Sequence, residues 1–370
     1  MPTVSVISAV RPIPGALLRE LMSLRPYGPR AREALKPVLS VLVAVGVAIA
    51  LDLDDLSWAA FSGFMVMRGS IAETIPRGLM RIAGTAGGAL LGVLLAPGAA
   101  DSPVLLMAFL FLPSFIGTFQ SLTTKYSYAW LFFGFTTGLV LTEALASPET
   151  VLHFAATRVA EVTVGTCSCL VVASLFSDAR INTERADATL WCGRLSEFLN
   201  EDWLREHWSL LEHSTRTALA VALLPLVWRW FTIEDFSQTA VTSYLVMMIP
   251  SAAARERRYR TVYERMAHRT LGCLLGSAVA LLSVDLFGTG FGALAITLSV
   301  GVWVGYSIQI GREGVSYLGT QFTLGMLITL VQGPGPITDV TPGLERLLGI
   351  FIGSAMLCLL MLAWPLPEDD

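Results

Sequence analysis

Two arginines stand near the start of long apolar segments, where a charged side chain is costly. They are Arg158 and Arg346. An ionisable side chain inside a bilayer costs about 2.5–3.5 kcal/mol on insertion scales, so its presence favours a functional role. The planar guanidinium of arginine can hold a carboxylate through two parallel hydrogen bonds. The pair is therefore a candidate anion site. The alternative is that each arginine pairs with Glu161, with Glu345 or with the acidic hairpins described below, and fixes the packing of its helix.

Glu161 lies three residues after Arg158, so the two side chains share one face of a helix. Burial favours the protonated carboxyl group and a neighbouring arginine favours the carboxylate, so Glu161 could load and release a proton. The corresponding residue in the second half of the chain is Gly349, which has no carboxylate. We interpret Glu161 as a proton-coupling residue, with a static ion pair as the alternative.

Two further arginines, Arg81 and Arg269, open apolar helices in which small residues recur at every fourth position. The glycines that follow them are Gly84, Gly88 and Gly92 in one helix and Gly272 and Gly276 in the other. Small residues at this spacing let two helix backbones approach closely, as in many helix pairs in lipid. The preference for positive charge at cytoplasmic helix ends is sufficient to explain both arginines. The other interpretation is that they attract an anion to a cytoplasmic entrance.

Polar side chains also follow one apolar segment in each half of the chain. They are Tyr128, Thr136 and Thr137 in the first half and Tyr317, Gln321 and Thr323 in the second. Such residues either line a path through the membrane or hydrogen-bond neighbouring helices.

Two acidic hairpins, Asp54-Asp55 and Glu234-Asp235, occupy corresponding places in the two halves. Solvation explains exposed acids in a turn, and a docking surface for a partner is the alternative.

The composition requires these residues to be positioned by membrane-spanning helices. Apolar residues make up 54% of the 370 residues and charged residues only 15%, with a mean hydropathy of +0.63. A soluble domain carries about 25% charged residues. No phosphate-binding GxxxxGK[ST] motif occurs, and the cysteines and histidines have no metal-ligand spacing. We therefore expect an all-α membrane protein that is not an enzyme, has no metal or cofactor and binds no nucleic acid.

Twelve apolar segments are long enough to span a bilayer, although ten spans remain possible if one hairpin is re-entrant. The segments are 35–51, 56–73, 79–96, 103–121, 126–144 and 152–177, then 214–231, 236–254, 268–287, 289–308, 316–332 and 343–364. Arg81 and Arg269 are 188 positions apart (269 − 81), as are Arg158 and Arg346 (346 − 158). This shared offset indicates an internal duplication. Two repeats of six spans have the same orientation, with a pseudo-twofold axis along the membrane normal.

These segments predict five regions in the chain. Residues 1–30 form a basic cytoplasmic leader, 31–177 the first repeat, 178–213 a cytoplasmic amphipathic linker, 214–366 the second repeat and 367–370 an acidic tail. Arginine and lysine gather in loops on one side and acidic residues in loops on the other, so both termini are expected in the cytoplasm. We expect the amphipathic linker, residues 178–213, to lie on the membrane surface or beneath the helical bundle.

The motif R-x-x-G-T/C-x-x-G at the start of the third helix, repeated in one chain, resembles the fusaric acid resistance and aromatic acid exporter superfamily. The residues that carry the resemblance are Arg81–Gly92, Arg269–Gly276, Arg158–Gly165 and Arg346–Gly353. The resemblance implies a bacterial inner-membrane exporter of aromatic carboxylic acids and toxic compounds. It also implies a periplasmic adaptor of the membrane-fusion type and an outer-membrane channel as partners. Many members carry large cytoplasmic domains, which this sequence does not contain.

We therefore expect a proton-driven exporter of organic anions. Arg158 and Arg346 would hold the carboxylate, Arg81 and Arg269 would attract it, and Glu161 would couple protons. An anion channel is one alternative, and a non-transporting membrane subunit of an envelope or efflux assembly is another. Membrane lipids are expected partners, and both a monomer and a homodimer remain open.

Overall fold

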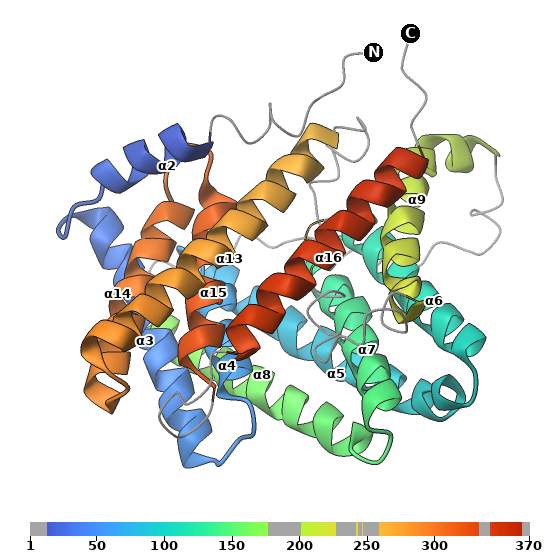
Figure 1. Ribbon diagram of the computed structural model, residues 1–370, viewed down its shortest axis with the longest axis horizontal. Helices are drawn as coiled ribbons and strands as arrows, with labels where there is room; N and C mark the ends of the chain where they lie inside the picture. The colour runs from blue at the N-terminus through green and yellow to red at the C-terminus, as the bar shows by residue number, and fades with distance from the viewer. Residues whose placement is uncertain are drawn as a thin grey trace, which may run out of the picture. The chain divides into compact units, whose positions relative to one another are not determined.

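The computed structural model describes residues 13–176, 201–226, 242, 246, 259–332 and 341–364. Within these ranges the chain is helical with short connections and contains no strand, so the expected all-helical fold is confirmed. The helices, labelled as in Figure 1, are α2 (Ile13–Met22), α3 (Pro29–Ala50), α4 (Leu56–Val66), α5 (Ile71–Asp101), α6 (Pro103–Thr123), α7 (Ser127–Ala146), α8 (Val151–Leu175), α9 (Glu201–Ala222), α13 (Tyr259–Phe287), α14 (Phe291–Gln309), α15 (Ser316–Leu330) and α16 (Thr341–Ala363).

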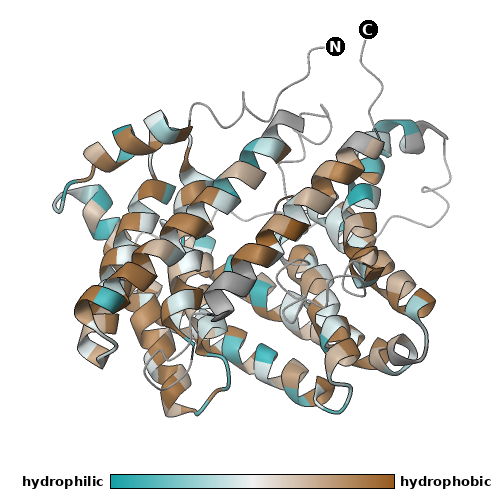
Figure 2. Ribbon diagram, in the orientation of Figure 1, coloured by the Kyte–Doolittle hydropathy of each residue, from teal (hydrophilic) through white to brown (hydrophobic). Residues whose placement is uncertain are grey.

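Seven of the described helices are long and apolar enough to cross a membrane. They are α3, α5, α6, α7, α8, α13 and α14. Figure 2 shows hydrophobic residues along most of the ribbon, with hydrophilic residues in short stretches. The protein is therefore a multi-pass membrane protein. The twelve spans predicted from the sequence stay a prediction, and the expected span over 236–254 lies outside the described residues except for 242 and 246.

α4 is too short to cross a bilayer alone. Its 11 residues rise about 16 Å at about 1.5 Å each, about half of a hydrocarbon core of about 30 Å. The helix begins at Leu56 because the carboxylate of Asp55 caps it, accepting hydrogen bonds from the N–H of Ser57 at 3.1 Å and its hydroxyl at 2.6 Å. It ends at Val66, and α5 begins at Ile71. The expected span over 56–73 was too long, because the polar residues from Arg68 to Ser70 interrupt the helix.

Two compact units divide the chain, and each draws on both halves of the sequence. Unit 1 contains Met1–Ile82, Ala156–Ile181 and Tyr263–Ile350. Unit 2 contains Ala83–Ala155, Asn182–Val262 and Phe351–Asp370. The boundaries fall within α5, α8, α13 and α16, so these helices contribute to both units.

In unit 1, α14 packs against both α3 and α15, while α4 packs against α3 and α15 (Figure 1). The core of these four helices includes Val41, Phe64, Val302 and Leu327, each at most 2% exposed. Trp303 on α14 joins the helices further, because its indole N–H donates to the backbone oxygen of Ala31 at 3.2 Å. The first helix of the chain to cross the membrane is thus packed on a helix from the second half.

The short helix α2 is attached to unit 1 through Glu20, which is 2% exposed. The Glu20 carboxylate accepts hydrogen bonds from the backbone N–H groups of Arg312 and Glu313, at 3.1 and 3.0 Å, and from the guanidinium of Arg30. Burial by itself raises the pKa of Glu20, but the hydrogen bonds from Glu313 and Arg30 and the charge of Arg30 outweigh it and hold the pKa below its ordinary value. The loop between α14 and α15 is therefore fixed to α2.

In unit 2, α6 packs against both α7 and α9 (Figure 1). The contact between α6 and α9 is aromatic, since the ring of Phe119 lies 6.0 Å from that of Trp203 and 6.4 Å from that of His207. α9 runs without interruption from Glu201 to Ala222, across the linker boundary expected at residue 213. The expected amphipathic linker and seventh span are joined in one helix there.

The two glycine-rich seams form close helix contacts, one in each unit. In unit 2, a Cβ atom at Gly84 of α5 would lie 2.3 Å from the backbone oxygen of Ala129 on α7. In unit 1, a Cβ atom at Gly276 of α13 would lie 2.1 Å from the backbone oxygen of Phe322 on α15. These distances leave no space for a methyl group, so the glycines are what permits the two backbones to meet.

Candidate functional site

α8 carries Arg158 and Glu161 on one face, as their spacing predicts. The side chains are 8% and 1% exposed, and Nη1 of Arg158 lies 3.2 Å from Oε2 of Glu161. A charge pair this deeply buried has lost most of its contact with water, so each member needs its partner. Both expected roles of Glu161, proton coupling and a static ion pair, are compatible with this geometry.

The first turn of α4 adds two more contacts to the pair. The backbone N–H of Asp55 donates to Oε1 of Glu161 at 3.0 Å, and Oδ2 of Asp55 lies 3.6 Å from Nη1 of Arg158. The Glu161 carboxylate thus lies at the N-terminus of α4. Unpaired N–H groups and the helix dipole favour negative charge at such a place. Asp55 was expected to dock a partner, but part of its carboxylate is engaged within the chain.

Trp58 completes the site from the same turn of α4. The centre of its ring lies 4.2 Å from the guanidinium carbon of Arg158, within the range of a cation–π contact. The ring also packs edge-on against Phe61, with centroids 5.4 Å apart. We call Asp55, Trp58, Arg158 and Glu161 the α4–α8 cluster. It combines a guanidinium, an aromatic face and two carboxylates.

Exposure differs among the members of the α4–α8 cluster. The side chain of Asp55 is 40% exposed and Trp58 is partly exposed, whereas the side chains of Arg158 and Glu161 are buried. An anion that reached Arg158 would compete with the two carboxylates for the guanidinium. The cluster can therefore exchange one carboxylate for another without leaving the arginine's charge uncompensated.

Arg81 lies near the other end of α4 and is only 2% exposed. Its Nη2 donates to the hydroxyl of Ser62 at 3.2 Å. One turn earlier in α5, Nε of Arg77 donates to the backbone oxygen of Met65 at 3.1 Å. Two arginines thus bind the C-terminal half of α4, where the helix dipole favours positive charge. An arginine that only sets the orientation of a span would lie in an exposed loop, whereas Arg81 is buried against α4.

Arg269, which opens the second arginine–glycine motif, is fully buried in unit 1. Its Nη1 donates to Oε1 of Gln321 on α15 at 2.8 Å, and the thiol of Cys273 donates to the same oxygen at 3.5 Å. The sequence predicted Arg269 as an anion-attracting residue and Gln321 as a path-lining residue. In the structure they are brought together by this hydrogen bond.

The other residues of the polar segments are mostly buried between helices. Tyr128, Thr136, Thr137 and Thr323 are at most 3% exposed. The hydroxyl of Thr137 donates to the backbone oxygens of Phe133 and Gly88, and that of Thr323 to Gly319. The ring of Tyr317 lies 4.1 Å from the guanidinium carbon of Arg265. These contacts favour the alternative in which the segments hold neighbouring helices together.

Several predicted site residues cannot be placed beside these. Arg346 lies in α16, but its side chain is outside the described residues, and so are Glu234 and Asp235. Asp54 precedes the cap of α4 and has contacts within the chain. Within the described part of the chain, no three His, Cys, Asp or Glu side chains are grouped so as to hold a metal ion.

Sequence reasoning missed three residues that take part in the interactions of buried arginines. Trp58 and Ser62 have no local pattern that reveals them, because their arginines lie elsewhere in the sequence. Arg216 could have been found, since it falls within the expected seventh span. It is 2% exposed, and its Nη2 lies 2.6 Å from Oε1 of Glu212 and 3.2 Å from the backbone oxygen of Trp364.

Comparison with known proteins assigns the family. Residues 30–227, more than half of the 370 residues, match the family described as the fusaric acid resistance protein family. The chain belongs to this family. The matched residues include Arg81 and the whole α4–α8 cluster, so the predicted resemblance is confirmed. A curated relative from Gluconobacter oxydans (strain 621H), named as an uncharacterized transporter, is 26% identical over 174 residues. That alignment covers 44% of this chain and 23% of the relative, so the chain spans less than a quarter of that relative's length.

Proposed function

We propose that this chain transports organic anions, in particular aromatic carboxylic acids, out of the bacterial cytoplasm across the inner membrane. The α4–α8 cluster is the observation that carries the proposal. It places the Arg158 guanidinium against the Trp58 ring and next to two carboxylates. A carboxylate and an aromatic ring on one small molecule would match these two surfaces. The family, and the relative named as a transporter, support transport rather than catalysis.

In the proposed mechanism, the substrate carboxylate replaces Asp55 or Glu161 on Arg158. The first turn of α4 assists, because a half-length helix that points its N-terminus at an anion is a device used by membrane transporters. The aromatic ring of the substrate then packs beside Trp58. We propose that Glu161 links this exchange to the proton gradient, because a proton gained or lost there changes which carboxylate occupies the arginine.

We propose further that the chain consists of two six-helix repeats in the same orientation, with twelve spans and both termini in the cytoplasm. Packing between helices from the two halves of the chain supports this proposal. α14, from the second half, packs on α3, and α6, from the first half, packs on α9. The α5 seam meets α7, and the corresponding α13 seam meets α15. Arg346 would then be the second anion-binding arginine, and Arg269 the counterpart of Arg81 near the cytoplasmic entrance.

The experiment that tests the function uses purified protein in liposomes loaded with radiolabelled hydroxybenzoate. A pH gradient and a membrane potential are imposed separately on wild type, Arg158→Ala, Glu161→Gln and the exposed-residue control Arg205→Ala. We expect flux in wild type and Arg205→Ala and loss of flux in Arg158→Ala, compared at equal amounts of folded protein in the liposomes. Glu161→Gln should keep exchange of labelled for unlabelled substrate but lose its response to the pH gradient.

Other outcomes would assign the alternatives. Flux that follows the membrane potential, ignores the pH gradient and appears as single-channel currents would identify an anion channel. Absence of flux from well-folded wild type, together with a co-purifying envelope protein, would favour a non-transporting subunit. A periplasmic adaptor of the membrane-fusion type with its outer-membrane channel is the partner that we propose for export. The acidic residues Asp54, Asp55, Glu234 and Asp235 are its proposed docking residues.

A further inference from the structure

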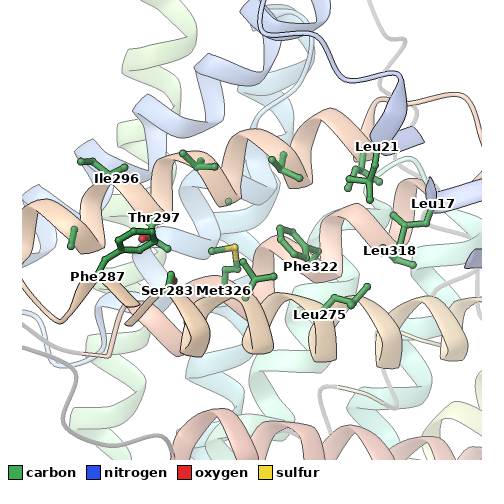
Figure 3. Close-up of a pocket in the computed structure, with 16 residues that line it drawn as sticks. Leu17, Leu21, Leu275, Ser283, Phe287, Ile296, Thr297, Leu318, Phe322 and Met326 are labelled. Atoms are coloured by element: carbon green, nitrogen blue, oxygen red, sulfur yellow. The ribbon is translucent and has the colours of Figure 1, made fainter. Parts of the chain in front are cut away.

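Unit 1 contains an apolar cavity that lies apart from the α4–α8 cluster. Its volume is about 990 Å³, and α2, α13, α14 and α15 form its walls. Figure 3 places Leu17 and Leu21 of α2 at one end, Phe287, Ile296 and Thr297 at the other, and Phe322 and Met326 between them. The floor depends on Gly301, because a Cβ atom there would lie 2.1 Å from the sulfur of Met326.

The chemistry of the lining excludes the proposed anionic substrate as the occupant. Among the sixteen lining residues the polar side chains are the hydroxyls of Ser283 and Thr297, and no lining side chain is charged. Moving a carboxylate into such surroundings without a partner costs far more than its apolar contacts could return. The cavity instead suits a long apolar chain.

The walls of the cavity open towards the hydrocarbon of the membrane. Val279, Ile296 and Val300 are 43%, 67% and 57% exposed, and they belong to helices that cross the membrane. The lining residues of α14 run from Ala293 to Ile308, a rise of about 22 Å at about 1.5 Å per residue, which is longer than one leaflet of about 15 Å and shorter than the hydrocarbon core of about 30 Å. The cavity therefore has the polarity of an acyl chain and a length that lies within the hydrocarbon core.

The end formed by α2 carries positive charge that suits an anionic headgroup. Glu20 and Glu313 are paired there with Arg30 and Arg19. The exposed arginines Arg25, Arg32 and Arg312 lie in or beside the same elements, and arginines near a membrane surface attract anionic lipids. Leu17 and Leu21 are four residues apart, so they project from one face of α2 over the end of the cavity.

We propose that this cavity binds one acyl chain of an anionic phospholipid, with its headgroup at the arginines beside α2. The lipid would fill the space between α13 and α14 and rest on Met326. It would be a bound component of unit 1, distinct from the lipids that exchange around the other spans.

The test uses phosphatidylglycerol with a photoreactive group on its acyl chain, in nanodiscs that contain the full chain. Labelled peptides are identified by mass spectrometry in wild type, in Val300→Trp, which fills the cavity, and in Leu94→Trp, a matched change at a 67% exposed residue of α5. We expect labelling of α13 and α14 in wild type and Leu94→Trp, and its loss in Val300→Trp. A second variant, Arg25→Gln/Arg312→Gln, leaves the cavity open and should remove the preference for phosphatidylglycerol over phosphatidylcholine.

Two results would overturn the proposal. Equal labelling of α5 and α14 that Val300→Trp leaves unchanged would mean ordinary exchanging lipid. Disulfide bonding between two copies that carry Val300→Cys, with no labelling of α14 in wild type, would mean that a second copy covers this face. Size-exclusion elution of Val300→Trp separates loss of lipid from loss of folding, and the double arginine variant tests the headgroup independently.

Discussion

The guanidinium carbon of Arg158 lies 4.2 Å from the centre of the Trp58 ring, although the two residues are separated by 100 positions (158 − 58). The contact joins a helix that crosses the membrane to one that reaches only halfway. The ring lies beside the guanidinium, and the carboxylates of Asp55 and Glu161 both approach its Nη1 atom, at 3.6 and 3.2 Å. A substrate carboxylate would have to compete for this group.

Replacing Trp58 with Ala should weaken binding of aromatic carboxylates more than binding of aliphatic ones. In the proposed mechanism the ring of the substrate packs beside Trp58, and an aromatic pair contributes about 0.5–1.5 kcal/mol, which corresponds to a selective loss in affinity of about 2- to 13-fold for acids that carry a ring. Competition between labelled hydroxybenzoate and each unlabelled acid measures the difference. Trp303→Phe is the control, because Trp303 lies in the same unit and only joins α14 to α3. An equal loss for both classes of acid would show that Trp58 acts through folding.

Stability of the α2 attachment should fall in acid. The folded pKa of Glu20 lies below its ordinary value of 4.5, so its contribution is fully present above about pH 4.5 and is lost as the pH falls through the folded pKa. The hydrogen-exchange protection of the backbone of α2 and of the loop at Arg312, measured relative to the intrinsic exchange rate at each pH, should therefore fall below that pH. Glu20→Gln should exchange quickly at neutral pH as well. Glu33→Gln, which breaks a more exposed pair with Lys36, should change little.

Gly84→Ala should destabilise the protein by about 1–3 kcal/mol, the usual cost of overpacking a close contact. The added methyl group would meet the backbone oxygen of Ala129 at 2.3 Å. Gly87→Ala is a matched control on the same helix, because its methyl group would lie 3.5 Å from the ring of Phe133, an ordinary contact. Alanine is also the better helix former by about 0.8–1 kcal/mol, so Gly87→Ala should be neutral or stabilising. Thermal unfolding in detergent compares the two variants. Equal melting temperatures would contradict the close contact between α5 and α7 at Gly84.

Arg216→Met should cost about 3–5 kcal/mol, because it leaves the buried Glu212 carboxylate without its partner. The double variant Arg216→Met/Glu212→Met should recover most of that loss, since an apolar pair in place of a buried ion pair is often neutral. Chemical unfolding of both variants gives the two values. If the double variant were as unstable as the single one, the contact of Arg216 with the backbone of Trp364 would be the more important one.

The sequence predicted the features that repeat locally. Helical spacing placed Arg158 and Glu161 on one face, apolar composition indicated a helical multi-pass membrane protein, and the arginine–glycine motifs indicated the family. The end of α4 was missed because Arg68 to Ser70 is a short break within a mainly apolar segment. Trp58 and Ser62 could not be found, because each meets its arginine only through tertiary packing. The bond between Asp55 and Glu161 spans 106 positions, and nothing in either local sequence indicates it.

The composition of unit 1 has a consequence for how the protein is made. Residues up to Ile82 leave the ribosome early, but the segment that completes their unit, Tyr263–Ile350, follows some 181 residues later (263 − 82). At about 5–20 residues per second, the 264 residues from the end of α4 to the end of α15 (330 − 66) take roughly 13–53 s to be synthesised. Until then, the faces of α3 and α4 that pack against α14 and α15 lack those partners. Unit 1 is therefore completed only after the second half of the chain has been synthesised.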